Sequence, residues 1–364
     1  MGKRESAVEK MVNRRETLDF FRGKRVLVTG HTGFKGSWLC WLLSGAGAQV
    51  TGFSLEPPTD PSLFQIAKME RRTNSLIGDI RDYGVLKEAF DRTAPEIVLH
   101  LAAQPIVRAG YREPRLTYET NVMGTVNLLE CCRLSESVRS VVNVTTDKVY
   151  KNREWAWGYR ENEELSGFDP YSNSKSCSEL VTQCYKDSFF RGGAAVSTAR
   201  AGNVIGGGDF AADRILPDCV RAAAKHETIG VRNPLSTRPY QHVLEPLFVY
   251  LMIARGQFDD PSYAGCYNVG PEGCDCVSTG ELAGLFCEIW GNGASWESRA
   301  EKHAPHEANF LRLDCSLLKN AFGWEPRWHI RQAVEKTCEW SKAWLAGQPI
   351  GEIMDRQISE FLED

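Results

Sequence analysis

The sequence lacks a long apolar run. The longest one, around Trp38–Ala48, is interrupted by Ser44, Gly45 and Gly47 and falls short of the roughly 20 residues that a membrane-spanning helix needs. Residues 1–25 also lack the apolar core of a secretory signal, because their charged side chains are not separated by a hydrophobic stretch. We therefore expect a protein with no membrane partner that stays in the cytoplasm.

An excess of charge of one sign is missing too. The 364 residues contain 43 Lys plus Arg and 47 Asp plus Glu, which gives a formal net charge of −4 and argues against a nucleic-acid partner. Twelve cysteines are too few for a disulfide scaffold of this length, so we expect them to be reduced. With 42% hydrophobic and 25% charged residues, the chain has the composition of a globular protein of one large or two unequal domains.

From Arg25 onward, short apolar runs alternate with longer helical patterns. The runs predicted as strands are Arg25–Thr29, Gln49–Phe53, Ile97–Leu101, Ser140–Thr145 and Ala194–Arg200. The segments predicted as helices are Gly36–Gly45, Asp82–Phe90, Arg115–Leu134 and Ser172–Phe189. Nearly continuous apolar strands that alternate with helices are typical of an α/β fold with a doubly wound parallel sheet, buried on both faces.

The pattern becomes irregular after about residue 200, with Gly206-Gly207-Gly208 and shorter helical segments. We read this part as a smaller, mixed α/β lobe that binds substrate. The run Cys266–Gly270 again has the pattern of a strand, so the chain is expected to return to the first sheet. The predicted division is an N-terminal arm at 1–23, a nucleotide-binding domain at 24–200 with a returning segment near 239–270, and the lobe in most of 201–364.

The first predicted strand runs directly into Gly30-His-Thr-Gly33-Phe-Lys-Gly36. Glycines at this spacing let the backbone approach a diphosphate, and the helix that follows offers free N–H groups and the positive end of its dipole. Glycines also serve ordinary turns, but a turn between a first strand and a helix favours dinucleotide binding. His31 and Lys35 would either contact the diphosphate or be exposed loop side chains.

The end of the second strand normally distinguishes NAD from NADP. The sequence there has neither the usual ribose-binding acid nor an arginine for a 2′-phosphate, and the next basic residue is Lys68. Ser54 is a candidate for the ribose hydroxyl and Asp79, after the third strand, for the adenine amine, whereas Glu56 fits an exposed loop equally well. These residues favour NAD.

Two further motifs bear chemistry. Thr145-Thr146-Asp147-Lys148 follows a buried strand, where sheets of this class bind ligands. Tyr171 and Lys175 stand four residues apart and so share a helix face. The positive charge of the lysine is expected to lower the pKa of the tyrosine, which allows a phenolate to take a proton from an alcohol. Tyr-x-x-x-Lys is common on helix surfaces, so this interpretation depends on the nucleotide turn before it.

Together these motifs resemble the extended short-chain dehydrogenase/reductase family of Rossmann-type enzymes, and within it the sugar-nucleotide 4,6-dehydratases that act on CDP-glucose. The resemblance covers roughly Phe20–Leu345. Thr-Asp-Lys stands where other sugar-nucleotide dehydratases carry Thr-Asp-Glu. The other matching segments are Leu101-Ala-Ala-Gln-Pro105, Arg200-Ala-Gly-Asn-Val-Ile-Gly-Gly-Gly-Asp209, Arg238-Pro-Tyr-Gln-His-Val243 and His306-Glu-Ala.

This resemblance implies loss of water from CDP-D-glucose to give CDP-4-dehydro-6-deoxy-D-glucose, with NAD reduced and reoxidised in one turnover. Tyr171 would take the proton of the 4-hydroxyl, Lys175 would hold the nicotinamide ribose, and Thr146 would orient the 4-oxygen. Lys148, if neutral, would take the C5 proton, and Asp147, if protonated, would donate to the departing 6-hydroxyl. Alternatively, Asp147 and Lys148 form a purely structural ion pair.

The resemblance also implies the binding residues. The expected cofactor contacts are Gly30, His31, Gly33, Phe34, Lys35, Gly36, Ser54, Asp79, Ile80, Ala102, Ala103, Gln104, Asn121, Thr145, Tyr171 and Lys175. The expected substrate contacts are Gln104, Arg108, Asn203, Arg214, Arg238 and His242. Asn203 and Arg238 would lie near the diphosphate and Arg214 in the nucleotide pocket. Each arginine also fits a surface salt bridge, and a buried, hydrogen-bonded role explains His242 equally well.

Other possibilities remain at this point. Cys274-x-Cys276 and His303-x-x-His306 resemble metal-ligand spacings, but neither has the usual two-residue gap and second pair, so we expect no metal. The resemblance implies a homodimer or tetramer formed by the helices at Arg115–Leu134 and Ser172–Phe189. The alternative functions are another nucleotide-sugar dehydratase, a 4-epimerase, or a non-catalytic NAD-binding scaffold or sensor.

Overall fold

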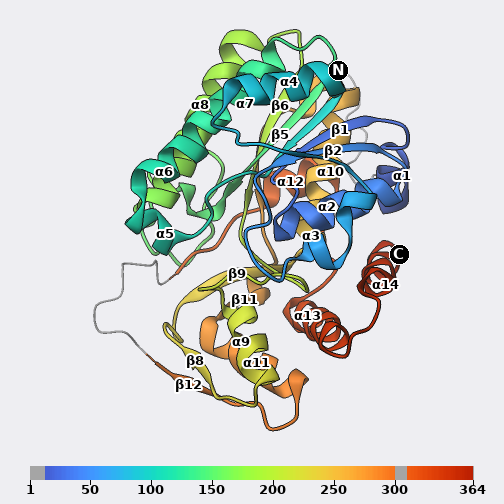
Figure 1. The fold of residues 1–364 in the computed structure, drawn as a ribbon. Helices are drawn as coiled ribbons and strands as arrows, with labels where there is room; N and C mark the ends of the chain where they lie inside the picture. The colour runs from blue at the N-terminus through green and yellow to red at the C-terminus, as the bar shows by residue number, and fades with distance from the viewer. Residues whose placement is uncertain (1–12, 300–309, 364) are drawn as a thin grey trace.

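The computed structural model describes residues 13–299 and 310–363 (Figure 1). Its larger domain is built on a seven-stranded sheet with the order β10-β6-β5-β4-β1-β2-β3, in which every neighbouring pair is parallel. The strands are β1 (Arg25–Thr29), β2 (Gln49–Ser54), β3 (Asn74–Ile77), β4 (Ile97–His100), β5 (Ser140–Thr146), β6 (Ala195–Ala201) and β10 (Cys266–Val269). The order reverses between β1 and β4, which is where such sheets open a crevice for a ligand.

Helices cover both faces of this sheet (Figure 1). One face packs under α2 (Phe34–Gly45) and α10 (Leu244–Asp259), together with the short segments α3 (Leu63–Ile66) and η2 (Met69–Arg71) and with α12 (Ser316–Phe322). The other face packs under α4 (Tyr83–Thr93), α7 (Gly124–Arg133) and α8 (Pro170–Phe189). Burial on both sides explains the continuous apolar strands, and the predicted doubly wound α/β fold is confirmed.

The helix predicted at Arg115–Leu134 is divided. It consists of α6 (Pro114–Tyr118), a π-helical turn η3 (Glu119–Met123) and α7, and α5 (Val107–Arg112) precedes it. Within η3, the side chain of Asn121 is buried and hydrogen-bonds the backbone N–H and C=O of Gln104. The wider turn thus aims a polar side chain at the loop after β4, a local feature that a 3.6-residue pattern does not reveal.

A smaller lobe lies below the carboxyl ends of the main strands (Figure 1). Its core is formed by a mixed three-stranded sheet, a two-stranded parallel pair and the helices that pack on them. The elements are β7 (Asn203–Ile205), β8 (Ile229–Val231), β9 (Thr237–His242), β11 (Cys276–Ser278), β12 (Trp296–Ser298), α9 (Ile215–Ala224), α11 (Thr279–Trp290) and α13 (Ile330–Leu345). Three short turns complete the described elements: η4 (Asp147–Val149) follows β5 and η5 (Pro261–Tyr263) follows α10 in the large domain, and η6 (Gly273–Asp275) precedes β11.

The chain crosses between the domains more often than the expected division at residue 200 implies. Besides β10 and α10, the C-terminal helix α14 (Ile350–Leu362) joins the core of the large domain, where Phe361 contacts Phe248. The part of the expected N-terminal arm that is described forms α1 (Arg14–Asp19), which packs on α10 and is followed by the fully buried Phe21. None of the described helices combines the length and the apolar character that crossing a membrane requires.

The turn after β1 is tightly folded. Gly30 has a φ of +75°, and a Cβ there would lie 2.8 Å from the backbone nitrogen of Ala102. A Cβ at Gly36 would lie 2.1 Å from the carbonyl oxygen of Gly30, whereas one at Gly33 would lie 3.4 Å from the same oxygen. Only the first of these two distances is a clash, so Gly36 and Gly33 have different structural roles in one turn.

We therefore expect Gly36→Ala to destabilise the protein by ~1–3 kcal/mol, because the turn must open to admit the methyl group. Gly33→Ala, the matched control, should leave the unfolding transition nearly unchanged. Thermal and denaturant unfolding of the two variants provide the measurement. Equal stability of both variants would show that the turn is not under this steric constraint.

Candidate functional site

A cavity of about 1040 Å³ lies between the two domains, at the carboxyl ends of β5 and β6. Its walls contain backbone and side chains from the large domain and from β7, α9 and β9 of the lobe. The residues expected from the sequence that line it are Lys35, Arg108, Thr145, Thr146, Lys148, Tyr171, Asn203, Arg214 and Arg238. The fold thus brings together residues that are far apart in the sequence.

An acid and a base candidate lie side by side in this wall. Thr146 ends β5, and its hydroxyl hydrogen-bonds Asp147 Oδ1 at 2.9 Å. Lys148 Nζ donates to the same oxygen at 3.0 Å and to Asn203 Oδ1 at 3.1 Å. Asp147 is fully buried, and its Oδ2 has no hydrogen-bond partner among the described residues. A buried oxygen without a partner is costly, so this atom marks an unsatisfied polar position directly behind Lys148, which lines the cavity.

Tyr171 faces this group from the start of α8. Asp169 caps the helix by accepting a hydrogen bond from the Ser172 N–H, and Pro170 occupies its first turn, where its missing N–H is not needed. Tyr171 hydrogen-bonds the Thr146 side chain. The helix N-terminus therefore brings the phenol to the end of β5.

The pKa of Tyr171 corrects one expectation. Burial raises it to about 12, with Asp147 adding to the rise, while the Thr146 hydrogen bond and Arg214 oppose it. Lys175, one turn along the helix, instead donates to the Val144 carbonyl at 3.0 Å, and burial lowers its own pKa to about 8. The expected lowering of the tyrosine pKa is not found in the protein alone, because desolvation is its largest influence and the charge that opposes the rise belongs to Arg214 and not to Lys175.

Lys35 lines the cavity, near the charged groups of Asp147, Lys175 and Arg214. Its Nζ donates to the Tyr250 hydroxyl at 3.2 Å. Burial lowers its pKa to about 7, with further lowering by Arg214 and Lys175 and a rise from Asp147. Lys35 is thus not the exposed loop side chain that the sequence also allowed, and its contact with the diphosphate stays a prediction.

The turn itself fits a dinucleotide diphosphate through its backbone. Gly33 is the N-cap of α2, and no side chain caps the first turn of that helix within the described structure. His31 does not take part as expected: its imidazole is fully buried against Gly52, and Nε2 bonds the Ser75 hydroxyl at 2.7 Å. Burial lowers the pKa of His31 to about 4, so the side chain is a neutral core group.

The side chain of Ser54 is likewise engaged in hydrogen bonds within the protein. It is 6% exposed, and its hydroxyl bonds Thr32 Oγ1 at 2.7 Å and the Leu55 carbonyl at 2.8 Å. These contacts hold the end of β2 to the turn, so the hydroxyl is not free for a ribose in the way we expected. Asp79 remains at the edge, where it holds Arg81 through both Nε and a terminal nitrogen, and this pair lowers its pKa.

Hydrogen bonds to neighbouring elements hold the loop after β4 in place. Ala102 N–H donates to the Thr29 hydroxyl at 3.2 Å, and Gln104 uses both ends of its amide, toward Thr117 Oγ1 and the Ile106 N–H. The amide of Asn121 is likewise occupied by Gln104 and Ser174. The amides of Gln104 and Asn121 therefore position the loop, and their direct contacts with ligands stay a prediction. Ile80 is buried and fills the space above Gly124.

Of the expected substrate residues, all but Gln104 and His242 line the cavity. Arg214 pairs with Asp209 at 2.9 Å, and Arg238 is 6% exposed. His242 is fully buried between Trp38 and Trp328, and its Nδ1 accepts from the Leu244 N–H at 3.3 Å. The expectation of substrate contact by His242 is corrected to the core role that the sequence also allowed. His303 and His306 lie outside the described residues.

A buried ion pair that supports the end of β5 was not predicted from the sequence. Glu179, one turn after Lys175 on α8, pairs with Arg200 of β6 at 2.8 Å in the protein interior. The same carboxylate accepts hydrogen bonds from Thr145 and from Thr198. A glutamate four residues after Lys175 on the same helix face was the available signal.

Most of the chain matches one protein family. The sequence profile described as GDP-mannose 4,6 dehydratase matches residues 27–337. The chain belongs to this GDP-mannose 4,6-dehydratase family. The resemblance to sugar-nucleotide 4,6-dehydratases that the motifs indicated is thereby confirmed.

Curated relatives in the family include the CDP-glucose 4,6-dehydratase of Salmonella typhimurium strain LT2. It is 46% identical over 351 residues, which are 94% of this chain and 98% of the relative. The dTDP-glucose 4,6-dehydratase of Xanthomonas campestris pv. campestris is 24% identical over 345 residues, 88% of this chain and 95% of the relative.

Solved structures share the fold. UDP-glucose 4-epimerase of Thermus thermophilus, in complex with NAD, superposes with a TM-score of 0.76 at 24% identity, over 87% of this chain and 99% of that one. The dTDP-glucose 4,6-dehydratase of Bacillus anthracis str. Ames, also with NAD, gives a TM-score of 0.73 at 21% identity, over 88% of this chain and 97% of that one. Epimerases and dehydratases therefore use the same architecture.

Proposed function

We propose that the protein is an NAD-dependent CDP-D-glucose 4,6-dehydratase, which converts CDP-D-glucose to CDP-4-dehydro-6-deoxy-D-glucose and water. The 46% identity to the curated Salmonella CDP-glucose 4,6-dehydratase supports this substrate. The observation that carries the reaction is the Asp147–Lys148 pair at the end of β5, where Lys148 lines the cavity and the buried Asp147 Oδ2 has no hydrogen-bond partner among the described residues.

The residues present fit NAD. The glycine turn admits a close diphosphate, and the uncapped start of α2 offers N–H donors to it. When bound, NAD would supply hydride chemistry, with a hydride taken from C4 of the sugar and given back to C6, and its positive charge would favour the phenolate form of Tyr171 that burial disfavours.

The first proton leaves the 4-hydroxyl. Tyr171 takes this proton, and Thr146, which hydrogen-bonds the phenol, orients the 4-oxygen. Lys175 lies on the same helix face and donates to the Val144 carbonyl of β5, and it would hold the nicotinamide ribose of bound NAD. Because α8 packs on β5, the base Tyr171 lies at the strand end where the 4-hydroxyl of the sugar would bind.

The elimination follows from the resulting ketone, which acidifies the hydrogen on C5. Lys148 takes that proton in its neutral form, and Asp147 in its protonated form gives one to the 6-hydroxyl, which leaves as water. When hydride returns to C6, Lys148 gives its proton back to C5, and the proton that Tyr171 took from the 4-hydroxyl replaces the one that Asp147 lost. The two side chains share one hydrogen bond, at 3.0 Å, so a proton gained by one is close to the proton lost by the other. Asn203, the first residue of β7, accepts a second hydrogen bond from Lys148 and so steadies the amine.

The nucleotide part of the substrate is assigned to the cationic wall. Arg108, Arg214 and Arg238 line the cavity, and guanidinium groups bind diphosphate oxygens in pairs. Asp209 raises the pKa of Arg214 and fixes its direction. These charges favour a diphosphate over a neutral sugar.

The deciding experiment incubates the protein with CDP-D-glucose and NAD and measures the mass of the nucleotide sugar, with UDP-, dTDP- and GDP-sugars as controls. We expect loss of one water from CDP-glucose without net reduction of NAD. An unchanged mass with altered stereochemistry would instead assign an epimerase. No change with any substrate would favour a binding protein.

Replacing Lys148 by Met tests the base against the structural ion pair. A missing base should lower turnover by ~10²- to 10⁴-fold, and C4 oxidation without elimination should build up absorbance of the reduced nicotinamide in a single turnover. Lys87→Met, on the distant helix α4, is the control and should retain full turnover. Wild-type turnover of Lys148→Met, with CDP binding unchanged, would establish the structural pair.

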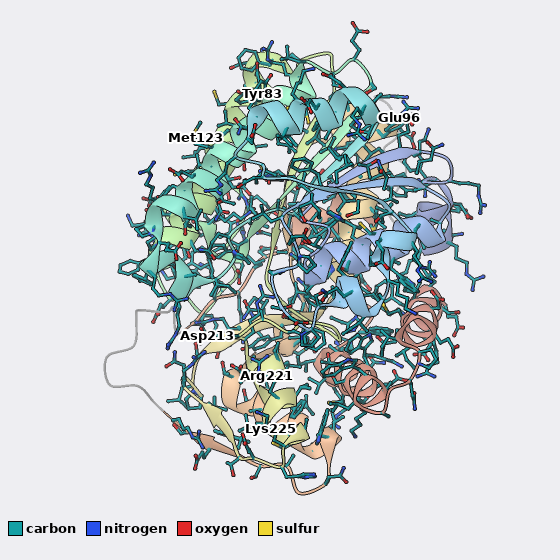
Figure 2. All side chains as sticks on the ribbon, viewed as in Figure 1. Tyr83, Glu96, Met123, Asp213, Arg221 and Lys225 are labelled. Carbon is teal, nitrogen blue, oxygen red and sulfur yellow. The ribbon has the colours of Figure 1, made fainter. Side chains whose placement is uncertain are left out.

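We also propose a homodimer through the outer faces of η3 and α8, and a cytoplasmic location that fits twelve unpaired cysteines. Three large apolar side chains on these elements are about half exposed: Met123 at 52%, Leu180 at 57% and Phe189 at 53%. Met123 lies at the outer edge of the helices in Figure 2. A second copy of the same face would cover this surface, as in a four-helix interface.

Leu180→Asp should therefore shift the protein to a monomer, because the charge would be buried in the interface. Light scattering after size exclusion, at several concentrations, measures the mass. Leu317→Asp on α12, also exposed but far from α8, should leave the mass unchanged. A wild-type protein that stays monomeric at all concentrations would contradict the proposed interface.

A further inference from the structure

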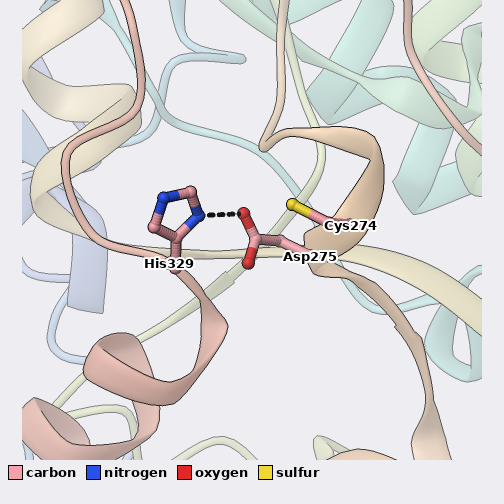
Figure 3. A group of neighbouring side chains, drawn as sticks. All are labelled: Cys274, Asp275 and His329. Carbon is pink, nitrogen blue, oxygen red and sulfur yellow. Dashed lines mark hydrogen bonds and ion pairs between the residues drawn. The ribbon is translucent and has the colours of Figure 1, made fainter.

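A second group of reactive side chains lies outside the cavity, where η6 meets the start of α13 (Figure 3). Cys274 and Asp275 come from η6, and His329 directly precedes α13. His329 Nδ1 lies 2.8 Å from Asp275 Oδ2. One ligand atom from each of the three residues lies within 4.8 Å of the other two.

We infer that Cys274, Asp275 and His329 form a binding site for a divalent transition metal of the zinc class. A thiolate, a carboxylate and an imidazole together suit zinc, cobalt or copper, whereas magnesium and calcium prefer oxygen ligands alone. Three protein ligands leave the fourth tetrahedral position to water. Binding releases the thiol proton and any proton that the imidazole carries at its metal-binding nitrogen, since the metal takes both lone pairs.

The carboxylate is already held in place. Asp275 is 3% exposed, and its Oδ1 accepts a hydrogen bond from the Ile330 N–H at 2.9 Å, which ties it to the first turn of α13. Oδ2 is the oxygen that points at His329 and Cys274 (Figure 3). A metal bound through Oδ2 would keep the contact with α13 intact, so binding demands little rearrangement of the backbone.

The electrostatic surroundings favour a cation. The carboxylates of Asp275, Glu272 and Glu245 all act on the His329 imidazole as negative charges. Lys319 pairs with Glu272 and offsets part of this negative charge. The imidazole and the thiol are exposed, so a metal ion reaches the site directly from solvent.

The ligands come from segments that only the fold brings together. In the sequence, Cys274 stands at a metal-ligand spacing from Cys276. The Cys276 thiol, however, contacts the Glu272 carbonyl at 3.8 Å and is not part of the group. Asp275 and His329 are 54 positions apart in the sequence. A metal here would join η6, which leads into β11, to α13, and should stabilise the folded state because the unfolded chain has no preformed site.

The test uses Co²⁺, whose thiolate complexes absorb in the near ultraviolet, added to chelator-treated full-length protein. We expect one equivalent to bind with this absorption in the wild type and zinc to displace it. Cys274→Ser should lose the thiolate absorption, and His329→Asn should weaken binding by at least about tenfold. Cys184→Ser, at another exposed cysteine on α8, should bind as the wild type does.

A parallel thermal unfolding series with zinc should raise the melting temperature of the wild type and of Cys184→Ser, but not of Cys274→Ser. Circular dichroism checks that each variant is folded before titration. Persistence of the thiolate absorption in Cys274→Ser, or its absence from folded wild-type protein at millimolar metal, would overturn the inference. Neither readout depends on turnover, so the result stands apart from the proposed dehydratase activity.

Discussion

The buried ion pair between Glu179 and Arg200 fixes the geometry on which the rest of the site depends. Its partners are 1% and 3% exposed and 2.8 Å apart. The glutamate also accepts from Thr145, and the guanidinium donates to the Tyr150 hydroxyl and to the Glu161 carbonyl. One charge pair thus connects α8, β5, β6 and the segment after η4. Loss of one partner would leave an uncompensated buried charge, at a cost of ~3–5 kcal/mol.

The same pair shapes the charges around the reacting groups. Burial lowers the pKa of Lys175 to about 8 and that of Lys35 to about 7, and the opposing charges are those of Glu179 and of Asp147, respectively. Both amines therefore bind protons less readily in the folded protein than in the unfolded chain. This costs folding free energy near neutral pH, and the cost falls as pH rises toward the ordinary lysine pKa. Amines held near their titration point suit a site that moves protons at neutral pH.

The sequence predicts the parts of this protein that follow local patterns. The strand Arg25–Thr29 has the predicted bounds, and the end of β5 carries Thr146 and Asp147 as expected, because alternation of apolar strands and helices determines where carboxyl ends meet. Long-range packing decides the rest. Trp328, 86 residues after His242, covers the histidine that we expected in the cavity, and nothing in the neighbouring residues indicates this. The predicted direction of the Tyr171 pKa shift differs from the structure for a similar reason, because the desolvation that raises this pKa arises only in the assembled interior.

The fold alone does not select the reaction, since an epimerase and a dehydratase superpose on this chain with TM-scores of 0.76 and 0.73. Both chemistries need a base for a sugar hydroxyl and a nearby dinucleotide, and the proposed function assigns these parts to Tyr171 and to the glycine turn. Dehydration needs in addition a base for carbon and an acid for the leaving hydroxyl. Lys148 and Asp147 are two consecutive residues at the end of one strand, and the buried, unpartnered Oδ2 of Asp147 offers a polar contact to a group beside them. The choice between reactions therefore depends on these two side chains, while the surrounding fold supplies their common setting.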